Sequence, residues 1–270
     1  MKDAYSFDTS WEELDQAYWT MFKAYHRIFT RCGLNFRAVE ADAGAIGGEG
    51  GTHEFMALAD IGEDTIAACT CCDYAANLEK AEPRIMEKSD TTPSLNTDKM
   101  EKFHTPGLRT IDQLVESLQI QPQDRIKTLI YMADDQPIAV VVRGDHGVNE
   151  VKVKHILGSE KFEIGSSNAV SKATGTPSGF VGPCGLTIPV WVDYAVVQMS
   201  SGIAGANELD HHYRHANPRR DMDLRHVADL RNVMKGEPCP RCDKGKLKFH
   251  CGIEIGQVFK LAFPESFLPL

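Results

Sequence analysis

Apolar residues recur every three or four positions between residues 10 and 31, and this spacing predicts one long amphipathic helix. The segment opens with Ser10 followed by Glu13, the signature of a capping box. Gly33 follows the last periodic residue and predicts the end of the helix. The inward face then carries Trp11, Leu14, Tyr18, Met21, Phe22, Tyr25, Ile28 and Phe29.

Three short β-prone runs follow this helix. They cover residues 36–40, 53–59 and 65–70, and a glycine-rich turn at 44–51 separates the first two. A four-residue turn joins the last two runs, so we expect them to pair as an antiparallel hairpin.

The composition changes after residue 72. Residues 79–108 are rich in Glu, Lys, Thr and Pro and have no apolar period, which indicates a long connection. Thr110 then opens a second capping box and a short helix. The remaining runs predict strands at 126–132, 138–143 and 187–192, and helices at 149–157, 168–173 and 224–233. Alternating strands and helices favour a mixed α/β domain over roughly residues 72–238.

Composition and charge narrow the classes of function. The 270 residues are 42% apolar and 25% charged, as in an ordinary globular protein. The net charge of −9 disfavours broad binding to duplex DNA and leaves only local contact with a strand end. No apolar run is long enough to span a bilayer and no signal core opens the chain, so we expect no membrane partner and a cytoplasmic location.

Eight cysteines without an export signal indicate reduced thiols or metal ligands rather than disulfides. Cys69 and Cys72 form one C-x-x-C pair, and Cys239 and Cys242 form another. Two such pairs can supply a four-thiolate structural zinc site, which would clamp the chain where it leaves and re-enters the first region. The alternative is that these are unmetallated cysteines in loops, because the pairs stand farther apart than in an ordinary zinc ribbon. Of the others, Cys71 and Cys251 are spare thiols, and Cys32 and Cys184 are expected to pack in the interior.

Three further segments carry candidate chemistry. The glycine-rich stretch lacks the ending of a phosphate loop, so it is either a tight turn or a close approach to a small ligand. Asp210 with His211, His212 and His215 forms either a surface histidine loop or a metal cluster, and one imidazole could stand at a pocket rim. The Gly179–Pro183 turn has amides that could face a carbonyl oxygen, or it simply leads into the next strand. No nucleophile motif is found, which disfavours covalent catalysis.

Eight sequence blocks, in their residues, order and spacing, closely resemble those of bacterial-type prolyl-tRNA synthetases, and together they extend over nearly the whole chain. They are M-K-D-A-Y-S-F-D (1–8), R-C-G-L (31–34), E-A-D-A-G-A-I-G-G (40–48), T-H-E-F (52–55), C-D-Y-A-A-N-L-E-K-A-E (72–82), V-R-G-D-H-x-x-N-E-V-K (142–152), A-D-L-R-N-V (228–233) and G-I-E-I-G (252–256). The resemblance implies an α+β fold in which a class II antiparallel-sheet core is interrupted by a mixed α/β editing domain. That domain hydrolyses alanine mischarged onto the proline tRNA.

The resemblance also implies a division of the chain. Residues 1–71 would be part of the class II core, residues 72–238 the editing domain with a connecting segment at 79–109, and residues 239–270 the return to the core. Motif 1, the motif 2 arginine, motif 3 and the anticodon-binding domain are missing, so we expect a fragmentary gene product. Such a chain would not activate proline or use the ATP and magnesium of the intact family, whose members are typically homodimers.

Motif by motif, the resemblance places functional positions on this sequence. For editing of the tRNA acceptor end they are Lys127, Gly179, Gly182, Pro183, Asp193 and His212. For substrate binding by the ligase core they are Gly47, Gly48, His53 and Glu54. We expect Lys127 to bind a terminal phosphate or ribose, the turn amides to polarise the ester carbonyl, and His212 to limit the pocket. The alternative is an inactive remnant that only binds zinc or a partner.

Overall fold

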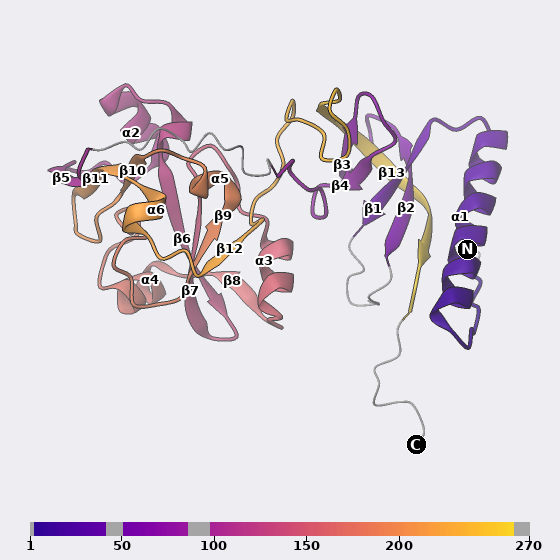
Figure 1. Ribbon diagram of the computed structural model, residues 1–270, viewed down its shortest axis with the longest axis horizontal. Coiled ribbons are helices and arrows are strands. Elements are labelled where there is room, and N and C mark those ends of the chain that lie inside the picture. Colours follow the sequence, from indigo (N-terminus) through magenta and orange to yellow (C-terminus); the bar gives the residue numbers. More distant parts are fainter. Residues whose placement is uncertain (1–2, 42–50, 86–97, 262–270) are drawn as a thin grey trace, which may run out of the picture. The chain divides into compact units, whose positions relative to one another are not determined.

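The computed structural model describes residues 3–41, 51–85 and 98–261, which form two compact units (Figure 1). Unit 1 joins Met1–Arg84 to Val233–Leu270, and unit 2 is Ile85–Asn232. The boundaries between the two units fall after residues 84 and 232. The sequence had suggested boundaries after residues 71 and 238. Both C-x-x-C pairs therefore lie inside unit 1. The protein is a mixed α+β structure, and none of its described helices combines the length and apolar character needed to cross a bilayer.

The strands of unit 1 close into a barrel in the order β1-β2-β13-β3-β4. Their bounds are β1 Phe36–Ala41, β2 Thr52–Leu58, β3 Asp64–Cys69, β4 Ala75–Asn77 and β13 Leu247–Phe259. Every pair is antiparallel except β1 with β4, which is parallel. The barrel thus joins strands from the two ends of the chain.

The hairpin expected between β2 and β3 is wrong, because β13 lies between them. Residues 252–259 of β13 pair with β2, and residues 247–252 pair with β3. The 13-residue β13 is long enough to pair with every residue of β2 and, farther along, with every residue of β3.

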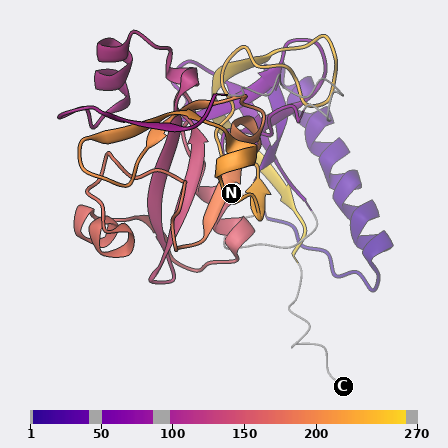
Figure 2. The same ribbon diagram turned by 60° about the vertical axis from the view of Figure 1, so that its left-hand side comes forward.

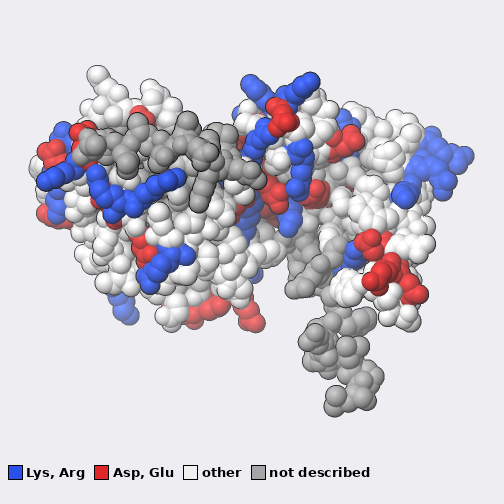
Figure 3. Space-filling view, viewed as in Figure 1, with Lys and Arg blue, Asp and Glu red and all other residues white. Residues whose placement is uncertain are grey.

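Helix α1, Trp11–Arg31, confirms the first prediction from the sequence. The Ser10 hydroxyl accepts from the Glu13 amide at 3.2 Å, while the Glu13 carboxylate turns back to the Thr9 amide at 3.1 Å. Gly33 ends the helix with φ +70°. The aromatic face of α1 packs against Phe55 and its neighbours in the barrel. Figure 3 shows acidic groups near one end of α1 and basic groups near the other, the polarity that the helix dipole favours.

Unit 2 contains a five-stranded sheet of order β12-β9-β7-β6-β8 and a three-stranded sheet of order β10-β11-β5 (Figure 2). The strands are β5 Glu101–His104, β6 Ile126–Ala133, β7 Gln136–Arg143, β8 Phe162–Ile164, β9 Val190–Asp193, β10 Gly202–Gly205, β11 His211–Ala216 and β12 His226–Ala228. The helices are α2 Ile111–Leu118, α3 Glu150–Leu157, α4 Ser167–Thr174, α5 Tyr194–Val197 and α6 Pro218–Asp221, with a 3₁₀ turn at Pro122–Asp124.

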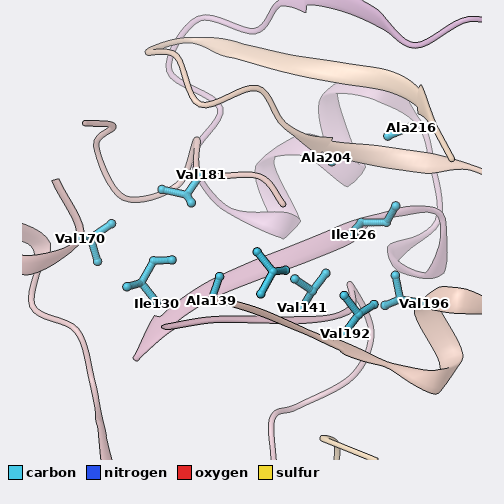
Figure 4. Close-up of a cluster of buried hydrophobic side chains, with 11 residues drawn as sticks. Ile126, Ile130, Ala139, Val141, Val170, Val181, Val192, Val196, Ala204 and Ala216 are labelled. Atoms are coloured by element: carbon cyan, nitrogen blue, oxygen red, sulfur yellow. The ribbon is translucent and has the colours of Figure 1, made fainter. Parts of the chain in front are cut away.

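Alternation along the central strands gives the larger sheet two apolar faces. Val141 belongs to a core that also includes Ala204 and Ala216 of the smaller sheet (Figure 4). Val140 and Val142 point to the other face and pack with Val153 of α3. Because both faces are covered, β7 is a continuous apolar run, as its sequence indicated.

The structure confirms most of the elements expected in unit 2, including the Thr110 capping box and α3. Two expectations are wrong. The helix expected at 224–233 is extended chain containing β12, because residues 226–228 pair with β9 as a parallel edge strand. The connection expected at 79–108 contains β5, a polar strand whose ladder with β11 compensates for its low apolar content.

Candidate functional site

Strand β11 places His212 in the interior of unit 2. Its side chain is 0% exposed, and Nδ1 lies 2.7 Å from the Thr105 hydroxyl. The Phe180 ring packs edge-on at 5.7 Å. Burial, with smaller contributions from Arg125 and His211, lowers the pKa of His212 to about 4, so the imidazole is neutral at pH 7. The surface histidine loop expected here is therefore wrong for His212, because pairing within a sheet turns alternate side chains inward.

Two buried nitrogens near this centre have no hydrogen-bond partner in the described structure. They are Nε2 of His212 and Nε of Arg125. Arg125 is only 5% exposed, and burial lowers its pKa to about 10. One of its terminal nitrogens donates to the Thr110 carbonyl at 3.4 Å. Buried polar atoms are normally satisfied, so two unpaired nitrogens in one region mark a place for a ligand or water.

The Gly179–Pro183 turn is fixed beside the same strand. Gly182 packs on Gly205, and a Cβ at Gly182 would lie 1.8 Å from the Gly205 oxygen. Gly205 is in turn the register partner of His212. Only glycine permits this approach, so the turn and the imidazole are held on neighbouring backbone segments.

Two of the amides in this turn are already engaged within the protein. The Gly182 amide donates to Oδ1 of Asn207 at 2.8 Å, and the Phe180 amide donates to the Pro177 carbonyl at 3.3 Å. Pro183 has no amide hydrogen. The expected oxyanion role therefore does not extend to Gly182 or Pro183, whose contribution is to shape the turn.

Lys127 lies at the start of β6, where its ammonium group donates to the His146 carbonyl at 2.5 Å. Burial lowers the pKa of Lys127, Arg125 lowers it further, and Asp145 opposes the shift. Close by, Arg143 donates two hydrogen bonds to the Asp145 carboxylate, at 2.6 and 2.8 Å. Lys127 is therefore close enough to Arg125 to be influenced by its charge, but its direct contact is with His146.

Asp193, also predicted as an editing-site residue, makes a separate set of contacts. It is 1% exposed at the end of β9 and accepts from the Ala195 amide at 2.8 Å and the Leu230 amide at 2.9 Å. Arg231 lies 3.8 Å away, and burial raises the pKa of Asp193. Its described contacts cap α5 and tie β9 to the segment after β12, and none of them reaches His212.

The predicted ligase-core positions lie in unit 1. Gly47 and Gly48 fall outside the described residues. His53 hydrogen-bonds the Tyr18 hydroxyl, and burial lowers its pKa. Burial and the nearby Glu254 raise the pKa of Glu54 to about 7. As successive residues of β2, His53 and Glu54 face opposite sides of the sheet, so they do not form one site.

The cysteine pairs come together as the spacing predicted. The sulfur atoms of Cys69, Cys72, Cys239 and Cys242 all lie within 4.8 Å of one another. Within residues 3–41, 51–85 and 98–261, this is the only group of three or more histidine, cysteine or carboxylate ligands placed to hold a metal, so His211, His212, His215 and Asp210 form none. Cys184 is half-buried, but Cys32 is exposed at the end of α1, where interior packing was expected.

Sequence reasoning missed four residues of these centres. They are Thr105, Arg125, His146 and Asn207, each of which is less than one-tenth exposed or hydrogen-bonds a predicted site residue. The Arg-Gly-Asp-His run in the 142–152 block could have signalled His146. Nothing local to Thr105 marks it, because its contacts are with residues more than 100 positions later: its amide donates to the Asp210 carbonyl and its hydroxyl bonds His212.

Comparison with known proteins adds two findings. Residues 105–221 match the family model of the aminoacyl-tRNA editing domain. The chain is also 49% identical, over 98% of its length, to a proline–tRNA ligase of Geobacter metallireducens, and 48% identical, over 97%, to one of Bacillus subtilis. It spans 46% of each relative, about half of their length. A solved putative trans-editing enzyme for prolyl tRNA synthetase aligns with 50% of this chain and 87% of its own, at 19% identity and TM-score 0.45.

Proposed function

We propose that unit 2 hydrolyses the ester of mischarged Ala-tRNA(Pro). The proposal is supported by the match of residues 105–221 to the aminoacyl-tRNA editing domain and by the similarity of the chain to proline–tRNA ligases. The observation that carries the proposal is the buried imidazole of His212, with Nε2 unpartnered, beside the Gly179–Pro183 turn and within the matched residues. An unpaired nitrogen at an otherwise packed centre has the polarity needed to meet an aminoacyl group or a water molecule.

Hydrolysis of an aminoacyl ester requires the protein mainly to position the substrate and a water molecule. An aminoacyl ester is hydrolysed by water once that water and the carbonyl are held in line, so no side-chain nucleophile is required. When Nδ1 of His212 donates to Thr105, Nε2 is an acceptor that can orient a water molecule or the substrate amino group. Because burial keeps the imidazole uncharged, this role persists at neutral pH.

Positive charge near this centre suits the tRNA end. Arg125 and Lys127 lie on one short run of β6 and its lead-in, and both are depressed in pKa by burial. A phosphate would offer Lys127 a charged acceptor in place of the His146 carbonyl it now contacts. Contact would then be limited to the strand end, consistent with a chain of net charge −9.

Selection between alanine and proline follows from size. A packed pocket wall at His212 and Phe180 would admit a methyl side chain and clash with a pyrrolidine ring. Exclusion by steric clash discriminates far better than the small gain from one extra methylene group. The correctly charged tRNA is therefore spared.

The test is deacylation of Ala-tRNA(Pro) beside Pro-tRNA(Pro) by the purified chain. We expect only the alanyl ester to be cleaved faster than in buffer. Lys127→Ala should slow cleavage about tenfold to a hundredfold, since a charge-assisted hydrogen bond contributes roughly 1.5–3 kcal/mol. Lys161→Ala, an exposed lysine of the same unit, is the matched control and should match wild type. His212→Ala removes both the pocket wall and the Nε2 acceptor, so it should cleave Ala-tRNA(Pro) more slowly and lose the preference for it over Pro-tRNA(Pro).

Failure of the wild-type chain to cleave either ester at high concentration would refute the proposal. So would a Lys127→Ala chain as active as the Lys161→Ala chain. In either case the alternative of an inactive, partner-binding remnant would replace it.

For unit 1 we infer part of a class II ligase core. The support is that similarity to the proline–tRNA ligases runs over 97–98% of the chain and so includes the barrel. Tyr18 and His53, which share a hydrogen bond, would then line one face of that core, with Glu54 on the opposite face of β2. Chains would pair as homodimers. Sedimentation of the purified chain tests the pairing, with a dimer expected.

A further inference from the structure

The spacing of four sulfur atoms in unit 1 is that of ligands around one ion. Sγ of Cys69 lies 3.6 Å from Sγ of Cys242, and Sγ of Cys72 lies 3.7 Å from Sγ of Cys239. A tetrahedron with zinc–sulfur bonds of about 2.3 Å has edges of about 3.8 Å. A disulfide would bring two sulfurs to about 2.0 Å. The thiols are therefore too far apart to be bonded and at the right separation to share a metal.

Both cysteine pairs sit on tight turns whose amides point at sulfur. The amides of Cys71 and Cys72 donate to Sγ of Cys69 at 3.2 and 3.4 Å, and the Arg241 amide donates to Sγ of Cys239 at 3.3 Å. Amide hydrogen bonds to sulfur stabilise the thiolate, which is the form that binds metal. Both turns thus present the first cysteine of each pair as a ligand.

Gly245 leaves room for the thiols. A Cβ at this position would lie 2.1 Å from Sγ of Cys69 and 2.9 Å from Sγ of Cys242. The second turn also closes through the Cys239 amide, which donates to the Gly245 carbonyl at 2.9 Å. Without a side chain, this residue can lie over the sulfurs and shield them from solvent.

The surroundings suit a closed site with excess negative charge. Cys239 is 0% exposed and packs with Tyr74 and Leu247. Four thiolates around a divalent ion carry a net charge of about −2. The second turn carries Arg241, whose guanidinium is shared between Glu40 at 3.5 Å and Glu82 at 3.4 Å. Cys69, Cys72 and Cys242 are half-buried around the buried Cys239, so the group is largely enclosed by its own two turns.

We propose that Cys69, Cys72, Cys239 and Cys242 bind one zinc ion in a closed, four-thiolate structural site. Tetrahedral sulfur ligation fits zinc or iron, and the closed shell of short turns, with no open position, favours zinc in a structural role. Cys69 ends β3 and Cys72 lies just beyond it, whereas Cys239 and Cys242 lie in the turn before β13, so the ion would join the turn after β3 to the turn that leads into β13. Cys69 is also the register partner of Leu247, the first residue of β13. The whole of unit 2 lies between the two cysteine pairs in the sequence. The ion would therefore hold together the two segments of unit 1 between which unit 2 is inserted.

Elemental analysis of the full chain, purified without chelator or metal-affinity resin, tests the proposal. We expect about one zinc per chain. Cys239→Ser should reduce zinc at least tenfold. The matched control is Cys71→Ser, since Cys71 is an exposed thiol between the two ligands Cys69 and Cys72, and it should retain the full amount.

A second measurement keeps the test decisive if Cys239→Ser fails to fold. Reduced wild-type chain, stripped of metal, is titrated with cobalt(II), a spectroscopic stand-in for zinc. We expect saturation at about one equivalent, with intense thiolate-to-cobalt charge-transfer bands and the visible bands of tetrahedral cobalt. Zinc added afterwards should abolish the spectrum.

Three results would overturn the proposal. The first is no zinc in the purified chain together with no cobalt uptake by the reduced chain. The second is iron in place of zinc at the same stoichiometry. The third is equal loss of metal from Cys71→Ser and Cys239→Ser. The deacylation assay is independent of all three, because the four ligands lie in unit 1.

Discussion

Four thiols of unit 1 lie in one cluster, whereas the two buried imidazoles of unit 2 lie apart. Four sulfur atoms of unit 1 lie within 4.8 Å of one another, but His212 and His146 of unit 2 have different neighbours, Thr105 and Arg143. Clustered thiolates repel one another unless a cation offsets their charge. Separate imidazoles avoid the problem by remaining neutral, at the cost of unpaired nitrogens. On the two proposals above, the first arrangement would stabilise the fold of unit 1 through a metal, and the second would leave polar groups for a substrate of unit 2.

Removal of metal should give the largest difference between the units. If one zinc joins the turn after β3 to the turn before β13, its loss should destabilise unit 1 by several kcal/mol, since a structural ion contributes its binding free energy to folding. Hydrogen–deuterium exchange before and after chelation checks this. Peptides from β3 and β13 should lose protection, while those from β6 and β7 should not. An equal loss in both sets would contradict the assignment of the ion to unit 1.

Asp193→Ala should be the most damaging single change in unit 2. It removes the acceptor of two buried amides, those of Ala195 and Leu230, and a neighbour of Arg231. We expect unit 2 to lose about 2–4 kcal/mol of its free energy of unfolding. Urea unfolding followed by exchange in α5 and β12 measures it. Asp193→Asn retains one oxygen acceptor and should lose less; if Asn costs as much as Ala, the negative charge rather than the capping is what matters.

Acid should weaken unit 2 through His212. The unfolded histidine has its ordinary pKa of 6.5 and the folded one a pKa of about 4, so between these values only the unfolded chain binds the proton. Stability is therefore full above pH 6.5 and falls towards pH 4 by about 1.4 kcal/mol per unit, or about 2 kcal/mol from pH 7 to 5. His146, with a pKa of about 3, acts in the same direction. The check is hydrogen exchange of β11 peptides in increasing urea, with the midpoint compared at pH 7 and pH 5. His212→Gln should make the free energy of unfolding depend less on pH.

Two helix caps offer the smallest and most direct comparison. Ser10 caps α1 in unit 1, and Thr110 caps α2 in unit 2, each accepting from a backbone amide at 3.2 Å. Replacing either by alanine should cost its own unit about 1 kcal/mol. Urea midpoints of exchange in α1 and α2 measure each loss. A loss shared by both units would show that they unfold together.

Strand pairing explains which parts of the fold the sequence could predict. In unit 2, β6 and β7 are neighbours in the chain and in the sheet, and their apolar runs predicted both. In unit 1 the partner of β2 comes from β13, almost 200 positions later, and no local pattern contains that pairing. The expected hairpin failed for this reason. Helix α1 was predicted because its cap and period are local.

The candidate sites divide in the same way. Paired cysteines carry their chemistry in their spacing, so the sulfur cluster was predicted without knowledge of the barrel. The family resemblance supplied His212 and Lys127, but it did not reveal that the Gly182 amide already has an acceptor in Asn207. Nor did it indicate that Asp193 caps a helix. Which hydrogen bonds are already made depends on packing between distant segments.

The position of β13 also sets an order of events during synthesis. Residue 247 follows all of unit 2, so β2 and β3 leave the ribosome long before the strand that lies between them. At about 5–20 residues per second, they wait on the order of ten to forty seconds with open edges. Unit 2 is complete by residue 232 and can fold during that interval. The unit that begins the chain is therefore the last to close, and its unpaired strands are the stretch most exposed to aggregation and to holding chaperones.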